Sequence, residues 1–212
     1  MLRWCKVDDR AHDEPDRPKE TPQKEKEQKT DIKHAVPSDF SPPLSVFTDG
    51  SCIANGTRHA RAGYAVVFPD HHPRHTEARA MVAGKGQPPV TNNRAELMGC
   101  IRAFEIARDA IDPSYSRNLV IYTDSQLMID SITKWLPGWK RRGWVKADGK
   151  TPVLNRDLLE RLDRLREERG AHRTVFRHVR AHTGKENWES QMNALADRLA
   201  QEAATQLNDT NA

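Results

Sequence analysis

Hydrophobic and polar positions alternate in a regular way only from Leu44 onward. Residues 44–48 are a short apolar run that ends at Asp49-Gly50-Ser51. Apolar runs of this length, bounded by turn residues, are typical of buried strands. Residues 63–69 and 78–83 have the same character and are separated by a turn rich in His and Pro. The pattern therefore predicts three strands in succession.

Helical spacing begins after these strands. Asn92 or Asn93 can cap a helix whose apolar face includes Leu97, Ile101 and Phe104, at a spacing of three to four residues. The remaining expected elements are a strand at 118–123, helices at 125–135 and 155–169, a strand at 174–181 and a helix at 194–204. Three strands followed by alternating helices and strands indicate an α/β fold with a mixed sheet and helices packed on it.

The first 43 residues have a different composition. They hold 6 of the 13 prolines and carry 9 Lys/Arg and 10 Asp/Glu, a net charge of 9 − 10 = −1. Such a segment buries too little apolar surface to offset its ordering entropy. We therefore expect residues 1–43 to be a disordered polar tail, 44–205 a single catalytic domain and 206–212 a disordered C-terminus. A docking signal within the tail is the alternative.

The remaining residues carry 25 Lys/Arg and 20 Asp/Glu, so their net charge is 25 − 20 = +5. A basic domain suits a polyanionic partner, although many enzymes with neutral substrates are mildly basic too. The three cysteines, Cys5, Cys52 and Cys100, lack metal-site spacing and are odd in number, which favours reduced thiols. No run approaches the ~20 apolar residues of a membrane span, and the start lacks the apolar core of a signal peptide. An intracellular, soluble protein is expected.

Four acidic residues stand where catalysis is expected in such a fold. Asp49 and Asp124 each follow an apolar strand, and ligands gather at the carboxyl ends of strands in α/β sheets. Glu96 lies in the first turn of a predicted helix, where the helix dipole favours a carboxylate, and Asp197 lies in the last helix. Clustered carboxylates bind hard cations such as Mg²⁺ or Mn²⁺, and two such ions can support phosphodiester cleavage. His182 could assist proton movement.

Each of these residues also has an ordinary interpretation. Asp49 in Asp-Gly-Ser fits a turn, and Asp124 could cap the helix that follows it. Glu96 could be only a partner of the helix dipole. Asp197 could be a solvated helix acid, and His182 an exposed loop residue. Their joint occurrence, in order and among the motifs below, is what favours the chemical interpretation.

Five sequence strings together resemble type 1 ribonuclease H. They are Thr48-Asp49-Gly50-Ser51-Cys52, Thr91-Asn92-Asn93-Arg94-Ala95-Glu96-Leu97, Tyr122-Thr123-Asp124-Ser125-Gln126, Val179-Arg180-Ala181-His182-Thr183-Gly184 and Asn193-Ala194-Leu195-Ala196-Asp197-Arg198-Leu199-Ala200. The resemblance runs from about Leu44 to Ala204, with no motif missing. It implies a ribonuclease H-like fold: a five-stranded mixed sheet in the order 3-2-1-4-5, flanked by helices.

The resemblance also implies hydrolysis of the RNA strand of RNA–DNA hybrids, leaving 5′-phosphate and 3′-hydroxyl ends. The cofactor would be two Mg²⁺ ions, for which Mn²⁺ can substitute, and the enzyme would act as a monomer away from membranes. The implied metal ligands are Asp49, Glu96, Asp124 and Asp197, with Asp49 bridging both ions. His182 would be a mobile auxiliary residue.

Further positions are implied to bind the hybrid. Contacts to 2′-hydroxyls distinguish RNA from DNA, and by resemblance Asn55, Asn92, Asn93 and Gln126 supply them. Thr91 and Asn155 resemble parts of a phosphate pocket for the DNA strand. In the basic stretch 135–144, aromatic rings interleave with cations, a combination that suits sugars and phosphates. The DNA-strand contacts expected there are Trp139, Lys140, Arg141, Arg142 and Trp144, whereas Trp135 is expected in the core.

The chain also departs from the commonest family pattern. His182 and Asp197 are about five residues further apart than usual, which leaves open whether His182 keeps its role. Three other functions are alternatives: a binding module without cleavage, another two-metal nuclease on the same fold, and a fragment of a reverse transcriptase. The complete acid set opposes the first, and the Trp/Lys/Arg stretch with the Asn/Gln set opposes the second. The short tail in place of polymerase sequence opposes the third.

Overall fold

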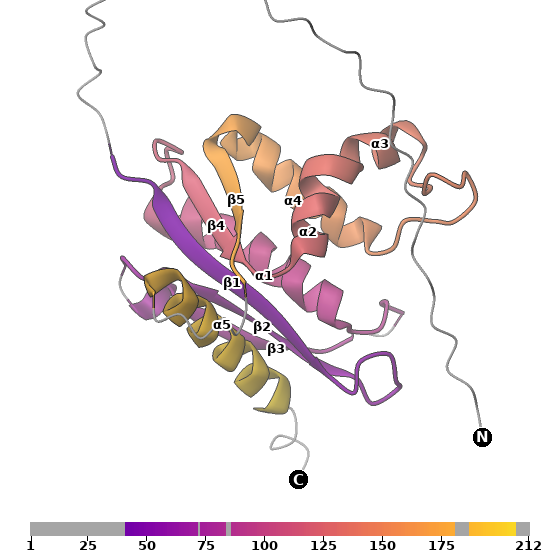
Figure 1. Ribbon diagram of the computed structural model, residues 1–212, viewed down its shortest axis with the longest axis horizontal. Coiled ribbons are helices and arrows are strands. Elements are labelled where there is room, and N and C mark those ends of the chain that lie inside the picture. Colours follow the sequence, from indigo (N-terminus) through magenta and orange to yellow (C-terminus); the bar gives the residue numbers. More distant parts are fainter. Residues whose placement is uncertain (1–40, 72, 84–85, 181–186, 207–212) are drawn as a thin grey trace, which may run out of the picture. The chain divides into compact units, whose positions relative to one another are not determined.

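A five-stranded sheet forms the centre of the computed structural model, which describes residues 41–71, 73–83, 86–180 and 187–206 (Figure 1). The strand order is β3-β2-β1-β4-β5, which confirms the expected order. β1 pairs antiparallel with β2 and parallel with β4. β2 pairs antiparallel with β3, and β4 pairs parallel with β5. The strands are β1 Leu44–Ile53, β2 Arg61–Val67, β3 Glu77–Met81, β4 Leu119–Thr123 and β5 Thr174–His178.

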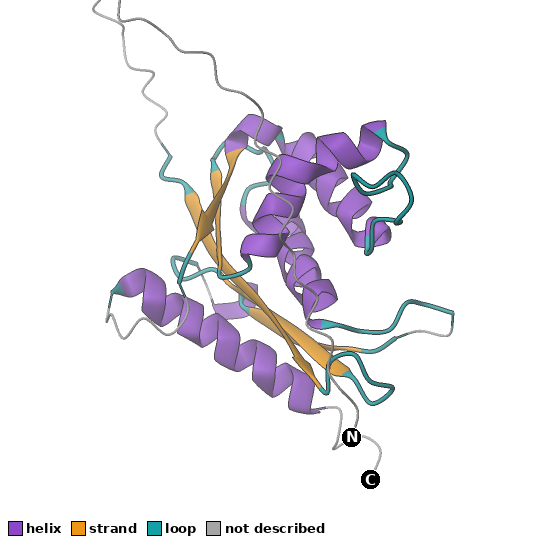
Figure 2. Ribbon diagram, turned by 45° about the vertical axis from the view of Figure 1, so that its right-hand side comes forward, coloured by secondary structure: helices purple, strands orange, loops and turns teal. Residues whose placement is uncertain are grey.

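Helices cover both faces of this sheet. Figure 2 shows α5 on one face and the other α-helices on the opposite face. The α-helices are α1 Asn92–Ile106, α2 Gln126–Asp130, α3 Leu136–Arg141, α4 Arg156–Arg169 and α5 Trp188–Thr205. Single π-helical turns, η2 Ala107–Ile111 and η3 Ser131–Trp135, extend α1 and join α2 to α3. Short 3₁₀ turns form at Pro73–His75 and Ala171–Arg173. None of the described helices is long and apolar enough to span a bilayer.

Coverage on both faces explains the apolar strand patterns. All five residues of β4 are buried, because neighbouring side chains alternate between the two covered faces. On the side of α1 and α4, the main core contains Val46, Ile121 and Leu162. On the side of α5, a smaller core contains Phe47 and Tyr122, whose rings stack with centroids 4.5 Å apart. The central strands β1 and β4 therefore hold the two helix layers together.

Two glycines allow helices to approach the sheet closely. A Cβ atom on Gly50 of β1 would lie 2.1 Å from the backbone nitrogen of Glu96 in α1. A Cβ atom on Gly63 of β2 would lie 2.5 Å from the backbone nitrogen of Ala204 in α5. Real Cβ contacts are not this short, so any larger residue would push the helix away. These contacts bring α1 and α5, the helices that carry Glu96 and Asp197, onto the strands.

The structure corrects several expected boundaries. β1 runs on to Ile53 instead of ending at Thr48, so Asp49 lies within a strand and pairs with Ala65. The last helix begins at Trp188, six residues before the expected start at Ala194 (194 − 188 = 6). The side chain of Asn187 caps it by accepting a hydrogen bond from the backbone N–H of Ser190 at 2.8 Å. The earlier start was missed because Trp188 and Met192 are separated by polar residues, although the Trp188 ring lies 5.2 Å from that of Phe47 and Met192 packs against the smaller core.

Candidate active site

Asp49 and Asp124 follow the end of the parallel pairing between β1 and β4. That pairing ends at Phe47 and Tyr122, and each aspartate comes two residues later in its chain. Side chains two residues apart in a strand share a face, so Asp49 lies on the same face as Phe47, the side of α5. The expectation that Asp49 is a turn residue is wrong, because its backbone belongs to β1.

Burial and neighbouring acids dominate the electrostatics of Asp49. The residue is only 6% exposed. Burial raises the pKa of its carboxyl group to about 8, with further contributions from the charges of Asp124, Asp197 and Glu96, while a hydrogen bond from the Gly50 backbone opposes the rise. Four acids that are distant in the sequence thus interact through space. Among the described residues, no basic side chain contributes to the pKa of Asp49.

Glu96 is the fifth residue of α1, just beyond the first turn where it was expected, and two side chains donate hydrogen bonds to it. The Oγ of Ser125 donates to Oε2 of Glu96, and Nδ2 of Asn92 donates to Oε1 at 2.8 Å. Burial raises the pKa of the Glu96 carboxyl group, and these two hydrogen bonds partly offset that rise. Ser125 also caps α2, because its Oγ accepts a hydrogen bond from the backbone N–H of Met128 at 3.2 Å. The idea that Asp124 caps this helix is therefore wrong.

Asp197 approaches from the opposite layer, on α5. Ala196 precedes Asp197 in the sequence, and Ala200 lies about one turn after it. Both are fully buried against the sheet, which fixes this part of the helix. Nε2 of Gln201 donates to Oδ1 of Asp197 at 2.6 Å. The position of α5 follows from the contact at Gly63 described above. Asp197 is thereby placed near enough to Asp49 to raise its pKa.

The donor set fits a hard divalent cation better than any other ligand class. Within the described residues, no three side chains of His, Cys, Asp or Glu are already close enough together to coordinate one ion. A buried Asp49 surrounded by three other acids would nevertheless be stabilised by added positive charge. Binding of such an ion would require these carboxylates to rotate towards one another. His182 lies outside the described residues.

The residues expected to read the RNA strand gather around the N-terminal end of α1. Oδ1 of Asn55 accepts a hydrogen bond from the backbone N–H of Asn92 at 3.3 Å. Asn93 is exposed in the first turn of the helix. Gln126 is exposed at the start of α2, and its Nε2 donates to Asp130 at 2.8 Å. Polar groups able to contact a ribose hydroxyl thus lie next to Glu96.

Thr91 and Asn155 lie on either side of Arg94, which the sequence reasoning missed. The Oγ1 of Thr91 caps α1 by accepting from the backbone N–H of Arg94 at 3.3 Å. The Arg94 guanidinium donates to Oδ1 of Asn155 at 3.3 Å and to both carboxylate oxygens of Asp157 at 2.9 and 2.7 Å. Asn155 adopts a left-handed backbone conformation, with φ +57°. A buried arginine thus joins the two predicted parts of the phosphate pocket.

The tryptophans of the stretch 135–144 are arranged differently from the expectation. Trp135 is 40% exposed, so its expected place in the core is wrong. Trp139 and Trp144 are partly buried and pack against the main core. The Trp135 and Trp139 rings lie 5.7 Å apart, and the guanidinium of Arg156 lies over the Trp144 ring at 5.1 Å. Trp135 therefore offers more free ring surface than the two residues chosen from the sequence.

The cations of the same stretch also differ from one another. Nζ of Lys140 donates to Oδ2 of Asp163 at 2.7 Å. Nε of Arg142 donates to the backbone carbonyl of Val145 at 3.3 Å. Arg141 is exposed and has no hydrogen bond or ion pair with any described residue. Of the three predicted phosphate contacts, Arg141 is the one that the fold leaves without a partner among these residues.

Comparisons with known proteins agree with this geometry. The family described as RNase H matches residues 42–205. The chain belongs to the ribonuclease H family. It is 37% identical over 163 residues to ribonuclease H of Thiobacillus denitrificans, an alignment that covers 77% of this chain and 94% of that protein. It is 35% identical over 190 residues to human ribonuclease H1, covering 84% of this chain and 60% of that protein.

A solved structure supports the fold of this ribonuclease H. The solution structure of the PFV RNase H domain superposes with a TM-score of 0.56 at 23% identity, covering 76% of this chain and 93% of that domain. At that identity the likeness concerns the fold alone. The sequence relatives identify the chain as a type 1 ribonuclease H, a hybrid-specific endonuclease that hydrolyses the RNA strand of RNA–DNA hybrids. The family typically uses divalent metal ions.

Proposed function

We propose that this hydrolysis takes place at Asp49, Glu96, Asp124 and Asp197, which together hold two Mg²⁺ ions, with Mn²⁺ able to substitute. The observation that supports this assignment is the buried Asp49 carboxyl, whose pKa is raised by burial and by the three other acids. Carboxylate oxygens are the ligands that Mg²⁺ prefers. No pairing with a basic residue relieves the crowding of Asp49 among the interactions that shift its pKa.

The protein's own part in the reaction is to orient its acids and the substrate. When bound, the two ions activate water and stabilise the leaving oxygen, which leaves 5′-phosphate and 3′-hydroxyl ends. Ser125 and Asn92 fix both oxygens of Glu96 before substrate arrives. Asp49 stands on the central strand between α1 and α5, so it is the residue best placed to be shared by both ions. Rigid strands and helices hold these groups more accurately than loops would.

The hybrid would lie across the N-terminal end of α1. Asn55, Asn92, Asn93 and Gln126 would contact ribose hydroxyls of the RNA strand, which DNA lacks. Thr91 and Asn155, joined through Arg94, would bind a phosphate of the DNA strand. Trp139, Trp144 and Arg141 would contact the same strand, whereas Lys140 would stay paired with Asp163. The enzyme would act as a monomer. His182 would assist proton movement from the segment after β5.

Substitution of Asp49 tests the assignment. We expect Asp49→Asn to reduce cleavage of a labelled hybrid in Mg²⁺ by about 10³-fold or more, because the shared ligand loses its charge. Asp109→Asn is the matched control, since that exposed acid pairs with Arg108 at the far end of α1. Duplex DNA and duplex RNA should remain uncut by either protein. Full activity of Asp49→Asn, or equal cutting of duplex DNA, would contradict the proposal.

A further inference from the structure

The turn between β1 and β2, residues 54–60, has a shape fixed by its own hydrogen bonds. The backbone N–H and the Oγ1 of Thr57 both donate to the carbonyl of Ala54, at 3.1 and 2.8 Å. The backbone N–H of His59 donates to Oγ1 of Thr57 at 3.1 Å. Gly56 adopts φ +80°, a left-handed conformation that glycine accepts at little cost. The turn therefore presents its side chains in a defined direction.

This turn is attached to the proposed active site. Oδ1 of Asn55 accepts from the backbone N–H of Asn92 at 3.3 Å, and Nδ2 of Asn92 donates to Glu96 at 2.8 Å. Two successive hydrogen bonds therefore connect the turn to a proposed metal ligand. Arg58 follows Asn55 by three residues, so its Cα lies within about 11 Å of that of Asn55. The turn is thus close enough to meet the strand that is being cleaved.

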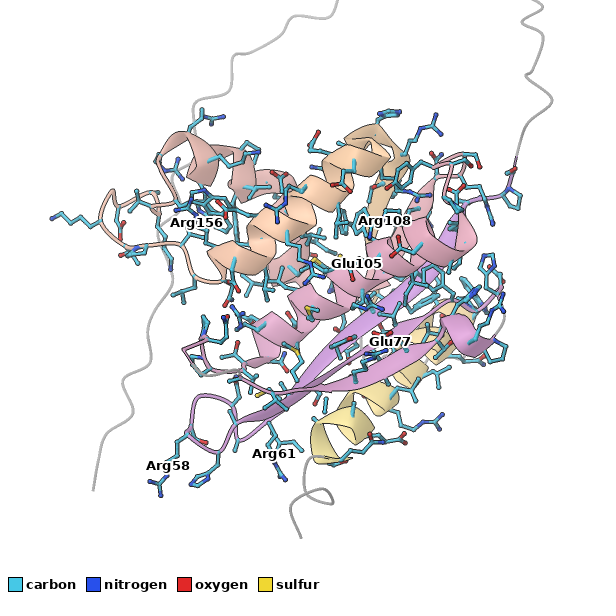
Figure 3. The ribbon with its side chains drawn as sticks, turned by 180° about the vertical axis from the view of Figure 1, so that it is seen from behind. Arg58, Arg61, Glu77, Glu105, Arg108 and Arg156 are labelled. Carbon is cyan, nitrogen blue, oxygen red and sulfur yellow. The ribbon has the colours of Figure 1, made fainter. Side chains whose placement is uncertain are left out.

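Arg58 is the exposed cation at the tip of this turn. Its Nε donates to Nε2 of His59 at 3.0 Å, which directs the guanidinium. It forms no ion pair with any described acid, and its two terminal nitrogens have no hydrogen-bond partner among the described residues. Figure 3 shows Arg58 projecting away from the body of the domain, on the same edge as Arg61. A guanidinium held in this way can bind a phosphate through both terminal nitrogens.

We propose that Arg58 binds a phosphate of the RNA strand a few nucleotides from the bond that is cleaved, an inference that rests on the proposed function. Nucleotides of one strand rise about 3.4 Å along the duplex axis, so the turn and the acids span only a few of them. Arg58 and Arg156 lie at opposite ends of one side of the domain in Figure 3. Arg156 adjoins the surface expected to hold the DNA strand. Asn55, in the same turn as Arg58, is a proposed contact of the RNA strand, so Arg58 would meet the backbone of that strand.

Salt dependence of binding provides the first test. Hybrid binding is measured in the Asp49→Asn background, in which the RNA is not cleaved, with Arg58→Ala, Arg58→Lys and Arg108→Ala added separately. Arg58→Ala should weaken binding about 5-fold and reduce the slope of log K against log salt by about 1. Arg58→Lys should recover most of the slope. Arg108→Ala removes the same charge at the far end of α1 and should change neither quantity.

Uncharged phosphate analogues in the hybrid identify the strand that Arg58 contacts. Replacing single phosphates by methylphosphonates in the RNA strand should weaken binding of the parent protein at one position and leave Arg58→Ala unaffected there. Two results would overturn the inference. One is that the position whose methylphosphonate effect disappears in Arg58→Ala lies in the DNA strand. The other is that Arg58→Ala has the same slope of log K against log salt as Arg108→Ala. Cleavage by the Asp49 proteins, measured separately, shows whether the proposed function holds. If Asp49→Asn is inactive but adding Arg58→Ala leaves the salt slope unchanged, only the role of Arg58 is rejected and the proposed function stands.

Discussion

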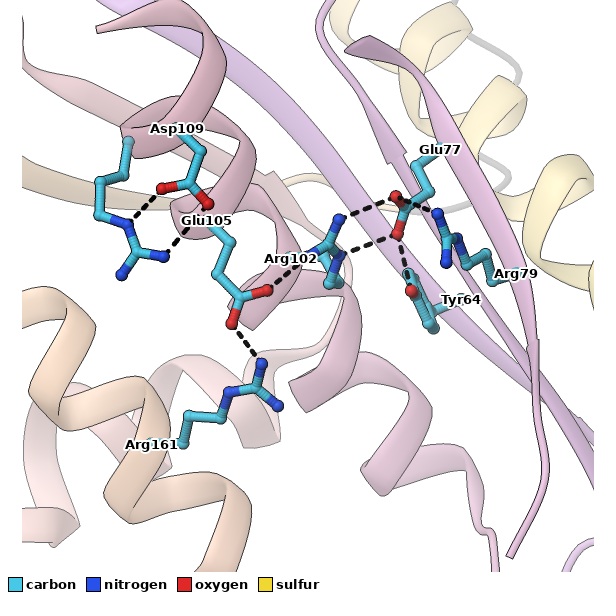
Figure 4. A network of polar contacts seen from close by, with 8 residues as sticks. Tyr64, Glu77, Arg79, Arg102, Glu105, Asp109 and Arg161 are labelled. Atoms are coloured by element: carbon cyan, nitrogen blue, oxygen red, sulfur yellow. Dashed lines mark hydrogen bonds and ion pairs between the residues drawn. The ribbon is translucent and has the colours of Figure 1, made fainter. Parts of the chain in front are cut away.

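Two clusters of charged side chains in this protein, one buried and one partly buried, differ in how their charges are compensated. One is the acid site around Asp49. The other, shown in Figure 4, is a polar network of Tyr64, Glu77, Arg79, Arg102, Glu105 and Arg161 that joins β2, β3, α1 and α4. In the network, the Arg102 guanidinium donates to both oxygens of Glu77 at 2.9 Å, and the Tyr64 hydroxyl donates to Glu77 at 2.7 Å. The carboxylate of Glu105 accepts hydrogen bonds from Arg102 and from Arg161.

The difference appears in the pKa values of the two acids. Burial alone would raise the pKa of Glu77, but the donors Arg102 and Tyr64 outweigh it, so the pKa is lowered. Burial raises the pKa of Asp49 to about 8, and neighbouring acids add to the rise. Burial thus disfavours the charged form of both carboxylates. Arg102 and Tyr64 compensate this cost at Glu77, whereas no described basic residue compensates it at Asp49. An uncompensated cluster on a rigid sheet is what a cation-binding site requires.

The sharpest test of this contrast is the stability of the protein without metal. The folded-state pKa of Asp49 lies above its unfolded value of 3.8, so the folded state binds more protons and stability falls as pH rises from about 4 towards 8. In EDTA at pH 8, Asp49→Asn should therefore unfold at a temperature higher than the wild type, by on the order of 5 °C. The gap should close near pH 4. Thermal unfolding monitored by circular dichroism measures both.

Magnesium should act on the wild type in the same direction as the substitution. Ions that bind only the folded state raise its stability, so added Mg²⁺ should raise the unfolding temperature of the wild type and have a smaller effect on Asp49→Asn. Asp109→Asn, at an exposed acid paired with Arg108, should respond to Mg²⁺ like the wild type. If Asp49→Asn were less stable than the wild type at pH 8, the acid cluster would not be electrostatically strained.

A smaller effect is expected in the network. Glu77→Gln should lower the free energy of unfolding at pH 7 by about 1–3 kcal/mol, because it weakens hydrogen bonds from Arg102 and Tyr64 in a largely buried place. Cleavage should change less than about twofold. Since the folded-state pKa of Glu77 is lowered, its contribution is complete above about pH 4.5 and is lost as pH falls through the folded value. The deficit of the variant should shrink in acid.

Urea unfolding at pH 7 and pH 3 measures this deficit. Glu160→Gln is the matched control, since Glu160 pairs with Arg156 on an exposed face of α4 and should contribute little. A loss of cleavage in Glu77→Gln greater than its loss of stability explains would show that the network also supports the active site. Equal stability of the two glutamine variants would show that the network contributes no more than a surface ion pair.

Local patterns in the sequence were sufficient for the five strands and for most helices, whereas the strand order was expected only from the family resemblance. Fully apolar strands such as 119–123 are recognisable because both faces of the sheet are covered. The extension of β1 beyond Asp49 was missed, because Gly50 and Ser51 have poor strand propensity. They are strand residues here because β2 pairs with them and α1 packs closely over Gly50. Tertiary contacts, rather than local preference, determine that segment.

Local patterns could not predict which side chains that are distant in the sequence contact one another in the fold. Arg94 looks like one more surface cation in the sequence, and only the fold brings it to Asn155 and Asp157. Ser125 follows Asp124 and was passed over, although a serine before a helix is a good cap signal. Its second role, donating to Glu96, depends on two distant segments meeting. Trp135 was misplaced because helical spacing does not tell which face of a short helix is covered.

The smallest expected effect separates two adjacent cations of the α3 region. Lys140 is paired with Asp163, a hydrogen bond that raises the pKa of the lysine, whereas Arg141 has no partner among the described residues. Arg141→Ala should weaken hybrid binding about 3-fold and reduce the salt slope by about 1, and Lys140→Ala should leave the slope nearly unchanged. Lys140→Ala should instead lower stability slightly, because it leaves the buried Asp163 without its cation.

Binding titrations at several salt concentrations, with urea unfolding of the same proteins, distinguish the two outcomes. If Lys140→Ala reduces the salt slope as much as Arg141→Ala does, then Lys140 leaves Asp163 when the hybrid binds, and a charge paired in the free protein also serves the substrate. The contrast between paired and unpaired charges would then hold only for buried groups. In exposed positions such as Lys140, water screens the pair, and a phosphate competes with Asp163 at little cost.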